Sequence, residues 1–180
     1  MSATPPLRVL ALCGSLRAIS TNKALLQAAQ RLAPEGMVID YFDALAAIPA
    51  FNPDDDREPL PPAVAALRGQ IKAADGLLIS SPEYARGVAG AFKNALDWLV
   101  SDEDFFGKPV AIFNASPRAE AGPAALRLTL ETMSARLIDA AAVTVPLINN
   151  PRDPAAIVGD PALSAAIRHA LDAFMWEMRG

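Results

Sequence analysis

Five short apolar runs, separated by helical patterns, place the strongest constraint on how this 180-residue chain can fold. Within the runs, apolar residues do not alternate with polar ones, which is typical of strands that are buried on both faces. A helix between successive strands supplies the crossover connection that parallel strands require. The pattern therefore predicts an α/β fold, with a flavodoxin-like doubly wound parallel sheet of five strands in the order 2-1-3-4-5 and helices on both faces.

The predicted elements can be assigned to stretches of the chain. We expect strands over residues 7–13, 37–42, 76–81, 110–114 and 140–145. Helical patterns cover residues 22–33, 63–74, 88–100, 124–136 and 161–178. The Pro-rich stretches 43–62 and 146–160 are expected to be surface loops. Because we find no internal repeat and no linker, we expect a single domain over residues 1–180.

Composition excludes several classes of protein. Apolar residues make up 52% of the chain and charged residues 20%, which is typical of a compact globular protein. A net charge of −4 argues against nucleic acid as the main partner. No apolar stretch approaches the roughly 20 residues that span a bilayer, so we expect no membrane partner. The single cysteine, Cys13, and the lack of a visible secretory signal predict a cytoplasmic location.

The polar loop after the first predicted strand is the strongest functional signal. A helix that starts after such a loop directs backbone N–H groups and the positive end of its dipole at an anion. The loop lacks the glycine patterns of dinucleotide and Mg-nucleotide sites, and its hydroxyls and one guanidinium suit a terminal phosphomonoester such as that of FMN. Turns and helix caps use the same residue types, so the loop alone leaves both interpretations open. The loop contains Gly14 and the polar residues Ser15, Arg17, Ser20, Thr21 and Asn22.

Two further polar loops follow the third and fourth predicted strands, at residues 80–87 and 114–118. In the predicted strand order, ligands bind at the carboxyl ends of the strands, where the order reverses between strands 1 and 3. All three loops should meet there and form one binding site. Each loop also has a plainer interpretation, because Ser-Pro-Glu-Tyr can form a rigid turn and Ser116-Pro117 can cap a helix.

Other conspicuous residues do not predict a site. The acidic run at residues 54–58 lacks the spaced ligands of a cation loop, so a solvated loop is the simpler interpretation and we expect no metal site. His169 is expected at the surface, since neither a second histidine nor a nucleophilic cysteine stands with it. We expect Trp98 and Phe92 to be core or dimer contacts.

Three sequence blocks resemble the NADPH-dependent FMN reductase family, which includes quinone, chromate and azo reductases. The resemblance covers nearly the whole chain and implies a flavodoxin-like domain with bound FMN, NADPH as co-substrate, and a homodimer or homotetramer. The apolar face of the helix predicted over residues 88–100 would form the dimer contact, through Val88, Phe92, Leu96 and Leu99. The three blocks are Gly14-Ser-Leu-Arg-Ala-Ile-Ser20-x-Asn22, Pro82-Glu83-Tyr84 and Lys93-Asn94-Ala-Leu-Asp97-Trp98.

The resemblance also implies the cofactor-binding residues. By position, the FMN phosphate would be held by Ser15, Arg17, Ser20 and Asn22, and the isoalloxazine would be lined by Pro82, Glu83 and Tyr84. Ser116 would approach the pyrimidine side of the ring.

The chain departs from the family pattern after Tyr84. Relatives usually have Asn there, whereas this chain has Ala85, Arg86 and Gly87, which we also count as cofactor-binding candidates. Arg86 either attracts the 2′-phosphate of NADPH or an anionic acceptor at the mouth of the site, or is a solvated loop arginine.

The implied reaction transfers a hydride from NADPH through FMN to a quinone or similar small acceptor. Because the cofactor carries this chemistry, we assign no catalytic side chain. If both substrates use one face of the flavin, they must bind in turn, which predicts ping-pong kinetics. Two alternatives remain open at this point: a flavodoxin-type electron carrier, and a non-catalytic module that binds phosphate or nucleotides.

Overall fold

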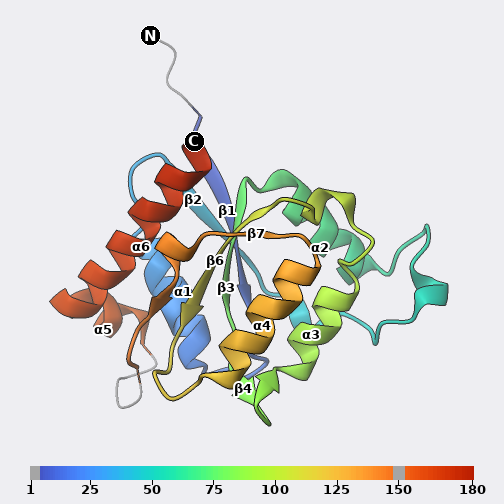
Figure 1. The fold of residues 1–180 in the computed structure, drawn as a ribbon, viewed down its shortest axis with the longest axis horizontal. Helices are drawn as coiled ribbons and strands as arrows, with labels where there is room; N and C mark the ends of the chain where they lie inside the picture. Colours follow the sequence, from blue (N-terminus) through green and yellow to red (C-terminus); the bar gives the residue numbers. More distant parts are fainter. Residues whose placement is uncertain (1–4, 148–152) are drawn as a thin grey trace.

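A parallel sheet forms the centre of the computed structural model, which describes residues 5–147 and 153–180 (Figure 1). Its strand order is β2-β1-β3-β6-β7, which confirms the predicted flavodoxin-like topology. All neighbouring strands on this path pair in parallel. The strands are β1 (Leu7–Cys13), β2 (Met37–Phe42), β3 (Gly76–Ser80), β6 (Pro109–Asn114) and β7 (Arg136–Leu137).

The last position of the sheet differs from the prediction, because two short strands share it. The first, β7, pairs with the start of β6, and β8 (Val143–Thr144) pairs with the end of β6. Between them lies a 3-10 turn, η4 (Asp139–Ala141), so the predicted strand over 140–145 is wrong in its first part. Alanine has a low preference for strands, and in this turn Ala141 is fully buried against the core.

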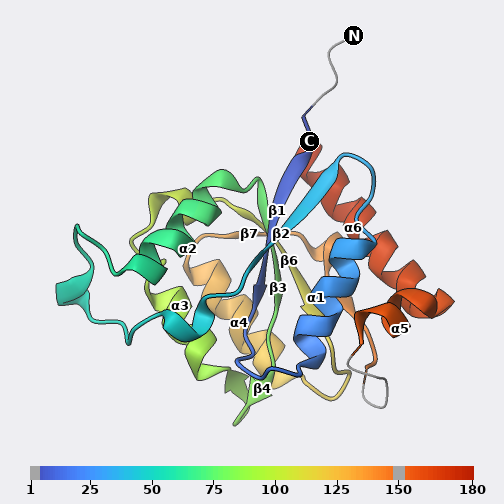
Figure 2. The ribbon, with the colours of Figure 1, turned by 180° about the vertical axis from the view of Figure 1, so that it is seen from behind.

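Helices cover both faces of the sheet (Figures 1 and 2). One face carries α1 (Thr21–Arg31), α5 (Pro154–Gly159) and α6 (Pro161–Arg179). The opposite face carries α2 (Pro62–Ala73), α3 (Gly90–Asp97) and α4 (Ala121–Thr132). Helix α5 was not predicted, because it lies in the Pro-rich stretch 146–160. It begins where the side chain of Asp153 accepts a hydrogen bond from the backbone N–H of Ala155 at 3.0 Å.

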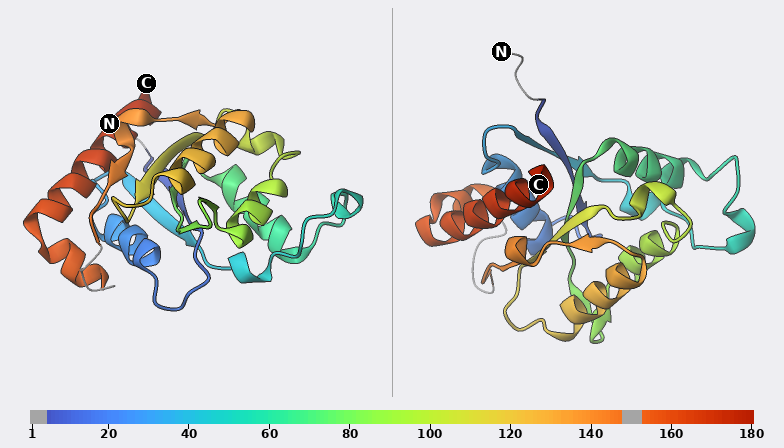
Figure 3. Two further views of the ribbon diagram at one scale, coloured as in Figure 1. Left: turned by 60° about the horizontal axis from the view of Figure 1, so that its bottom comes forward. Right: turned by 45° about the horizontal axis from the view of Figure 1, so that its top comes forward.

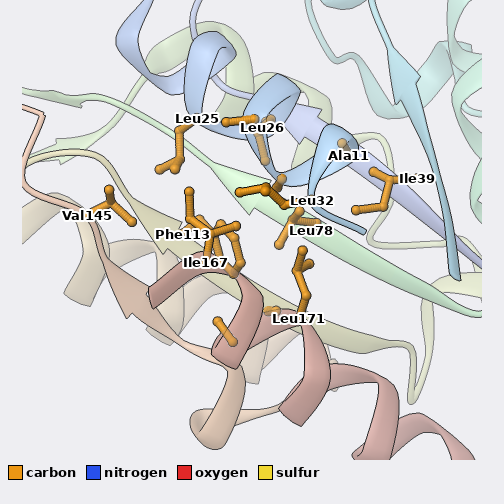
Figure 4. Close-up of a cluster of buried hydrophobic side chains, with 14 of the residues drawn as sticks. Ala11, Leu25, Leu26, Leu32, Ile39, Leu78, Phe113, Val145, Ile167 and Leu171 are labelled. Atoms are coloured by element: carbon orange, nitrogen blue, oxygen red, sulfur yellow. The ribbon is translucent and has the colours of Figure 1, made fainter. Parts of the chain in front are cut away.

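Strand β1 explains why the apolar runs do not alternate. Val9, Ala11 and Cys13 belong to the core under α1 and α6, while Leu10 and Leu12 belong to the core on the other face. Figure 4 shows the first of these cores, where Leu25 and Leu26 of α1 lie close to Leu78 of β3 and Phe113 of β6. Both faces of the inner strands are therefore apolar, as a doubly wound sheet requires.

The helix predicted over residues 88–100 is shorter than expected. Val88 belongs to a hairpin of β4 (Glu83–Tyr84) and β5 (Gly87–Val88), and α3 begins only at Gly90. Phe92, Leu96 and Leu99 are buried in the core of the same chain. These three side chains are therefore not available for the symmetric dimer contact that the sequence suggested. Trp98 is also buried, as predicted.

Helix α3 instead anchors the loop that follows β2. Both the amide of Asn94 and the indole Nε1 of Trp98 donate to the carbonyl of Pro49, at 2.8 and 2.9 Å. In return, Asn94 Oδ1 accepts from the backbone N–H of Phe51 at 2.8 Å. This loop contains the short 3-10 turns η1 (Leu45–Ala47) and η2 (Pro53–Asp55). Two residues of the third family block thus stabilise a loop.

A second contact fixes the acidic part of this loop. Arg68 of α2 forms an ion pair with Asp56 at 2.8 Å, and the Ser101 hydroxyl donates to the same carboxylate at 2.5 Å. The hydrogen bond from Ser101, followed by the Arg68 guanidinium, lowers the pKa of Asp56. Near this pair, the 3-10 turn η3 (Glu103–Phe105) begins after Asp102, and burial raises the pKa of the Asp102 carboxyl.

No helix within residues 5–147 and 153–180 has both the length and the apolar character to span a bilayer.

Candidate active site

A polar cavity of about 460 Å³ lies where the carboxyl ends of β1, β3 and β6 meet. In the left view of Figure 3, the chain segments that follow these strands come together at this end of the sheet. The volume lies in the range of about 300–1,000 Å³ that is typical of small-molecule sites. The lining residues are Ser15, Arg17, Ser20, Thr21, Asn22, Ser81, Pro82, Glu83, Tyr84, Asn114, Ala115, Ser116, Arg118, Ala119 and Leu147.

Most of the residues singled out in the sequence lie around this one cavity. From the first loop these are Ser15, Arg17, Ser20 and Asn22, and from the other two loops they are Pro82, Glu83, Tyr84 and Ser116. Three candidates, Ala85, Arg86 and Gly87, do not line it. We call residues 15–22 the helix end of the cavity, and residues 81–84 with 114–119 the loop end.

Some lining residues were not among the site residues predicted from the sequence. Thr21, Ser81, Asn114 and Arg118 lie in the three loops that the sequence had singled out, so their positions gave a signal. Leu147 follows β8, and only the topology brings it to the cavity.

The helix end is built around the first turn of α1. Ser20 is the N-cap residue, and its Oγ accepts from the backbone N–H of Lys23 at 3.4 Å. The N–H groups of Thr21 and Asn22 precede the first hydrogen bond within the helix, so they remain available to a ligand. The first turn holds no acidic side chain, and Arg17 lines the same part of the cavity. Together these groups favour an anion.

Asn22 has a structural contact as well as a place in the cavity. Its Oδ1 accepts from the Ser80 hydroxyl at 2.9 Å, and both residues are buried. This hydrogen bond joins the start of α1 to the end of β3 across 58 positions of sequence. The side-chain oxygen of Asn22 is therefore engaged, and its amide nitrogen and backbone N–H are the groups left for a ligand.

Gly14 allows the first two loops to approach each other. Its backbone N–H donates to the Ser80 carbonyl at 2.9 Å. A Cβ atom at this position would lie 2.2 Å from Ser81 Oγ and 2.7 Å from Ser81 Cβ, so any larger residue would force the loops apart.

The β4–β5 hairpin adds a wall to the loop end of the cavity. Its two central residues, Ala85 and Arg86, have positive φ values of 49° and 61°. This is the pattern of a type I′ turn, in which Asn and Gly are preferred. A left-handed conformation costs roughly 1–2 kcal/mol for most L-residues, so the turn is strained. The turn lies beyond Tyr84, which is 52% exposed and also borders a neighbouring cavity of about 370 Å³.

Asn114 organises the third loop. Its Nδ2 donates to the carbonyls of Ser116 and Ala119 at 2.8 and 3.3 Å, while its Oδ1 accepts from the Ser116 N–H at 3.1 Å. The Ser116 hydroxyl, in turn, accepts from the N–H of Arg118 at 3.3 Å. The loop is thus folded by its own polar side chains, with Arg118 at its rim.

The donor set of the cavity fits a ligand that has a phosphate group and a flat polar ring. The helix end offers hydroxyls, free N–H groups and a guanidinium, which match a phosphomonoester. The loop end offers Tyr84, Pro82 and backbone groups beside a second arginine. No clusters of side chains suited to a metal ion occur within residues 5–147 and 153–180.

Comparisons with known proteins show which family this chain matches. The sequence pattern of a family described as NADPH-dependent FMN reductase matches residues 7–150. An NAD(P)H-dependent FMN reductase of Pseudomonas aeruginosa is 46% identical over 112 residues, which are 61% of this chain and 60% of the relative. A quinone reductase of Escherichia coli K12 is 40% identical over 113 residues, again 61% and 60% of the two chains. The matched segment thus spans about 60% of the length of these relatives.

A solved structure shows the same fold over nearly all of the chain. FerB, a flavoenzyme NAD(P)H:(acceptor) oxidoreductase of Paracoccus denitrificans, superimposes with a TM-score of 0.79. The alignment covers 96% of this chain and 97% of FerB, at 24% sequence identity.

Proposed function

Because the chain belongs to the NADPH-dependent FMN reductase family, we propose that it binds FMN and reduces a quinone or similar small acceptor with NADPH. The observation that carries this proposal is the cavity in which the first turn of α1, Arg17 and the loops after β3 and β6 meet. The quinone reductase relative of Escherichia coli supports the choice of acceptor.

The helix end would hold the FMN phosphate. The N–H groups of Thr21 and Asn22, the hydroxyls of Ser15 and Ser20, and the guanidinium of Arg17 would share its negative charge. Several of these groups are already ordered by hydrogen bonds within the loop, such as Ser15 Oγ accepting from the Arg17 N–H at 3.3 Å. A site that is ordered in advance loses less entropy when the ligand binds.

The loop end would hold the isoalloxazine ring. Pro82 and Tyr84 would form a flat wall, and Ser116 would lie toward the pyrimidine side. The carboxylate residue in the lining of the cavity is Glu83, and its Oε2 accepts a hydrogen bond from the Gly122 N–H of helix α4. Backbone groups of these loops would orient the polar edge of the ring.

The residues of the cavity bind and orient, and the cofactor supplies the chemistry. FMN, when bound, provides a group that accepts a hydride and passes it on. Since one open cavity would serve both substrates, they would bind in turn, in agreement with ping-pong kinetics.

Arg86 is a candidate for cofactor preference. It stands in the turn of the β4–β5 hairpin, two residues beyond Tyr84. We propose that its guanidinium attracts the 2′-phosphate of NADPH or an anionic acceptor at the mouth of the site. Replacement of Arg86 by Ala should raise the KM for NADPH more than the KM for NADH, and an unchanged ratio would contradict this role.

We further propose that the chain works in the cytoplasm as a homodimer or homotetramer. The single cysteine, Cys13, is buried, as suits a reducing compartment. The contact between copies would use surfaces other than Phe92, Leu96 and Leu99, which the chain's own core occupies. Sedimentation of the purified protein would give the oligomeric state.

The proposed function is tested first by FMN binding. The purified chain should quench the fluorescence of added FMN, and Arg17→Ala should weaken binding about tenfold, the effect of losing one charge-assisted contact. Arg31→Ala is the matched control, because Arg31 lies at the other end of the same helix. A wild-type chain that stays colourless and does not bind FMN would refute the proposal.

The second step separates an enzyme from an electron carrier. Under anaerobic conditions and without a quinone, the FMN-loaded chain should oxidise NADPH only until its flavin is reduced. When a quinone is present in stoichiometric excess, the oxidation of NADPH should continue. A chain that binds FMN but is not reduced by NADPH would be a carrier.

A further inference from the structure

Glu83 joins two of the loops that line the cavity. Its Oε2 accepts from the backbone N–H of Gly122 at 2.8 Å, across 39 positions of sequence. We infer that Glu83 is a positioning residue, which attaches the β4–β5 hairpin to the first turn of α4 and so places the Tyr84 wall of the cavity. The inference rests on the proposed function only in the identity of the ligand.

Helix α4 has no cap from its own sequence. Its N-cap residue, Glu120, makes no side-chain hydrogen bond to the helix, and its backbone is already helical at φ −117° and ψ −48°. Pro123, in the first turn, has no N–H to cap. The N–H groups of Ala121 and Gly122 therefore precede the first bond within the helix, from Ala124 to the Glu120 carbonyl. The Glu83 carboxylate satisfies one of them, and its negative charge suits the positive end of the helix dipole.

The residue at position 122 must be small for this contact to form. A Cβ atom there would lie 2.8 Å from Cβ, 2.9 Å from Cγ and 3.1 Å from Cα of Glu83. Glycine is a poor helix former, so its presence in the first turn of α4 needs a reason. The close approach of Glu83 supplies that reason, and it makes Glu83 and Gly122 a matched pair.

The hairpin needs an anchor because its turn is strained. Left-handed conformations at Ala85 and Arg86 persist only where the surrounding structure holds them. Strand β5 packs against α4, and Figure 1 shows β4 beside the start of this helix. Glu83 stands two residues before the turn and directly before Tyr84. The hydrogen bond to Gly122 thus fixes strand β4, which contains Tyr84 and leads into the strained turn.

Hydrogen exchange in the ligand-free chain tests the anchor directly. In Glu83→Ala, the Gly122 amide should exchange about tenfold faster, whereas the amide of Leu78 in the sheet core should keep its rate. Glu83→Gln, which keeps an acceptor oxygen but loses the charge, should give a smaller change. The control is Glu120→Gln, an exposed carboxylate at the same helix end, which should change neither rate. Unchanged exchange at Gly122 in both Glu83 variants would overturn the inference.

FMN affinity, measured by fluorescence quenching, tests the consequence for the cavity. Glu83→Ala and Gly122→Ala should each weaken binding about tenfold, and Glu120→Gln should not. Adding Ala85→Asn to Glu83→Ala should restore part of the affinity, because Asn tolerates the left-handed conformation better than Ala. Weaker FMN binding without faster Gly122 exchange would mean that Glu83 contacts the ligand directly, and would refute positioning. If the wild-type chain bound no FMN, the proposed function would fail, while the exchange rates would still decide the role of Glu83.

Discussion

The two ends of the cavity are held in different ways. At the helix end, Ser15 and Ser20 bond to backbone groups two and three residues further along the chain. At the loop end, the contact between Glu83 and Gly122 spans 39 positions, and the bond that ties the two ends together, from Ser80 to Asn22, spans 58. The helix end and residues 114–119 of the loop end can therefore form once short segments fold, whereas the place of the β4–β5 hairpin depends on the completed sheet. Variants at each end of the cavity should therefore distinguish the parts that local contacts hold from the part that long-range contacts hold.

The largest effect is expected at Gly14, where the two ends touch. In Gly14→Ala, the added Cβ would lie 2.7 Å from Ser81 Cβ, and the loops must separate. We expect FMN affinity to fall about a hundredfold, because both ends of the ligand lose their alignment. Gly69→Ala is the control: nothing lies within 4 Å of its Cβ, and Ala favours helix α2 by up to about 1 kcal/mol. If Gly14→Ala bound FMN as tightly as wild type, the close contact of the two loops would not matter for binding.

A smaller effect is expected from Asn114→Ala, which acts on the loop end alone. The variant loses the two hydrogen bonds from Nδ2 and the one to Oδ1 that fold residues 114–119. We expect about a tenfold loss of FMN affinity, with a loss of stability of about 1–3 kcal/mol. Binding of inorganic phosphate, which would need only the helix end, should stay unchanged. Equal losses for FMN and phosphate would show that the two ends are not independent.

The helix end should respond more mildly to Ser20→Ala. The variant removes the N-cap bond to the Lys23 N–H and should cost about 1 kcal/mol of unfolding free energy. Phosphate and FMN should weaken by similar small factors, because both would use this end. Chemical denaturation gives the first value and titration gives the second. A loss confined to FMN would contradict the assignment of the phosphate to α1.

The smallest effect is expected outside both ends, at Asp56. The hydrogen bond from Ser101 and then Arg68 lower its pKa in the folded chain. These contacts therefore stabilise the protein above the unfolded pKa of about 3.9, and this stabilisation is lost as the pH falls through the folded value. Asp56→Asn should therefore be less stable than wild type at pH 7 and equal to it in strong acid, with little change in FMN affinity. Denaturation curves at a series of pH values measure this difference, and a gap that stayed constant with pH would contradict it.

Where the contacts are local, the sequence predicted which residues lie together around the cavity. Hydroxyls, an arginine and a helix start within residues 14–22 were enough to place the helix end. It was less informative about Glu83, whose carboxylate lies against α4, and about Asn94 and Trp98, which hold the loop near Pro49. It was wrong about the apolar face of α3, because periodicity shows that a face is buried without showing what buries it. Here the chain's own core covers Phe92, Leu96 and Leu99.

The sequence by itself determined the class of fold, the order of the strands and the edge of the sheet at which the polar loops meet. These follow from the spacing of apolar residues and from short polar segments, which act within a few residues of each other. Only the tertiary structure decided that the last strand divides around Ala141 and that Gly14 and Gly122 are sites of close approach. It also decided that a hydrogen bond attaches the β4–β5 hairpin to helix α4. Those features depend on contacts between residues that are far apart along the chain and come together only when the sheet has formed.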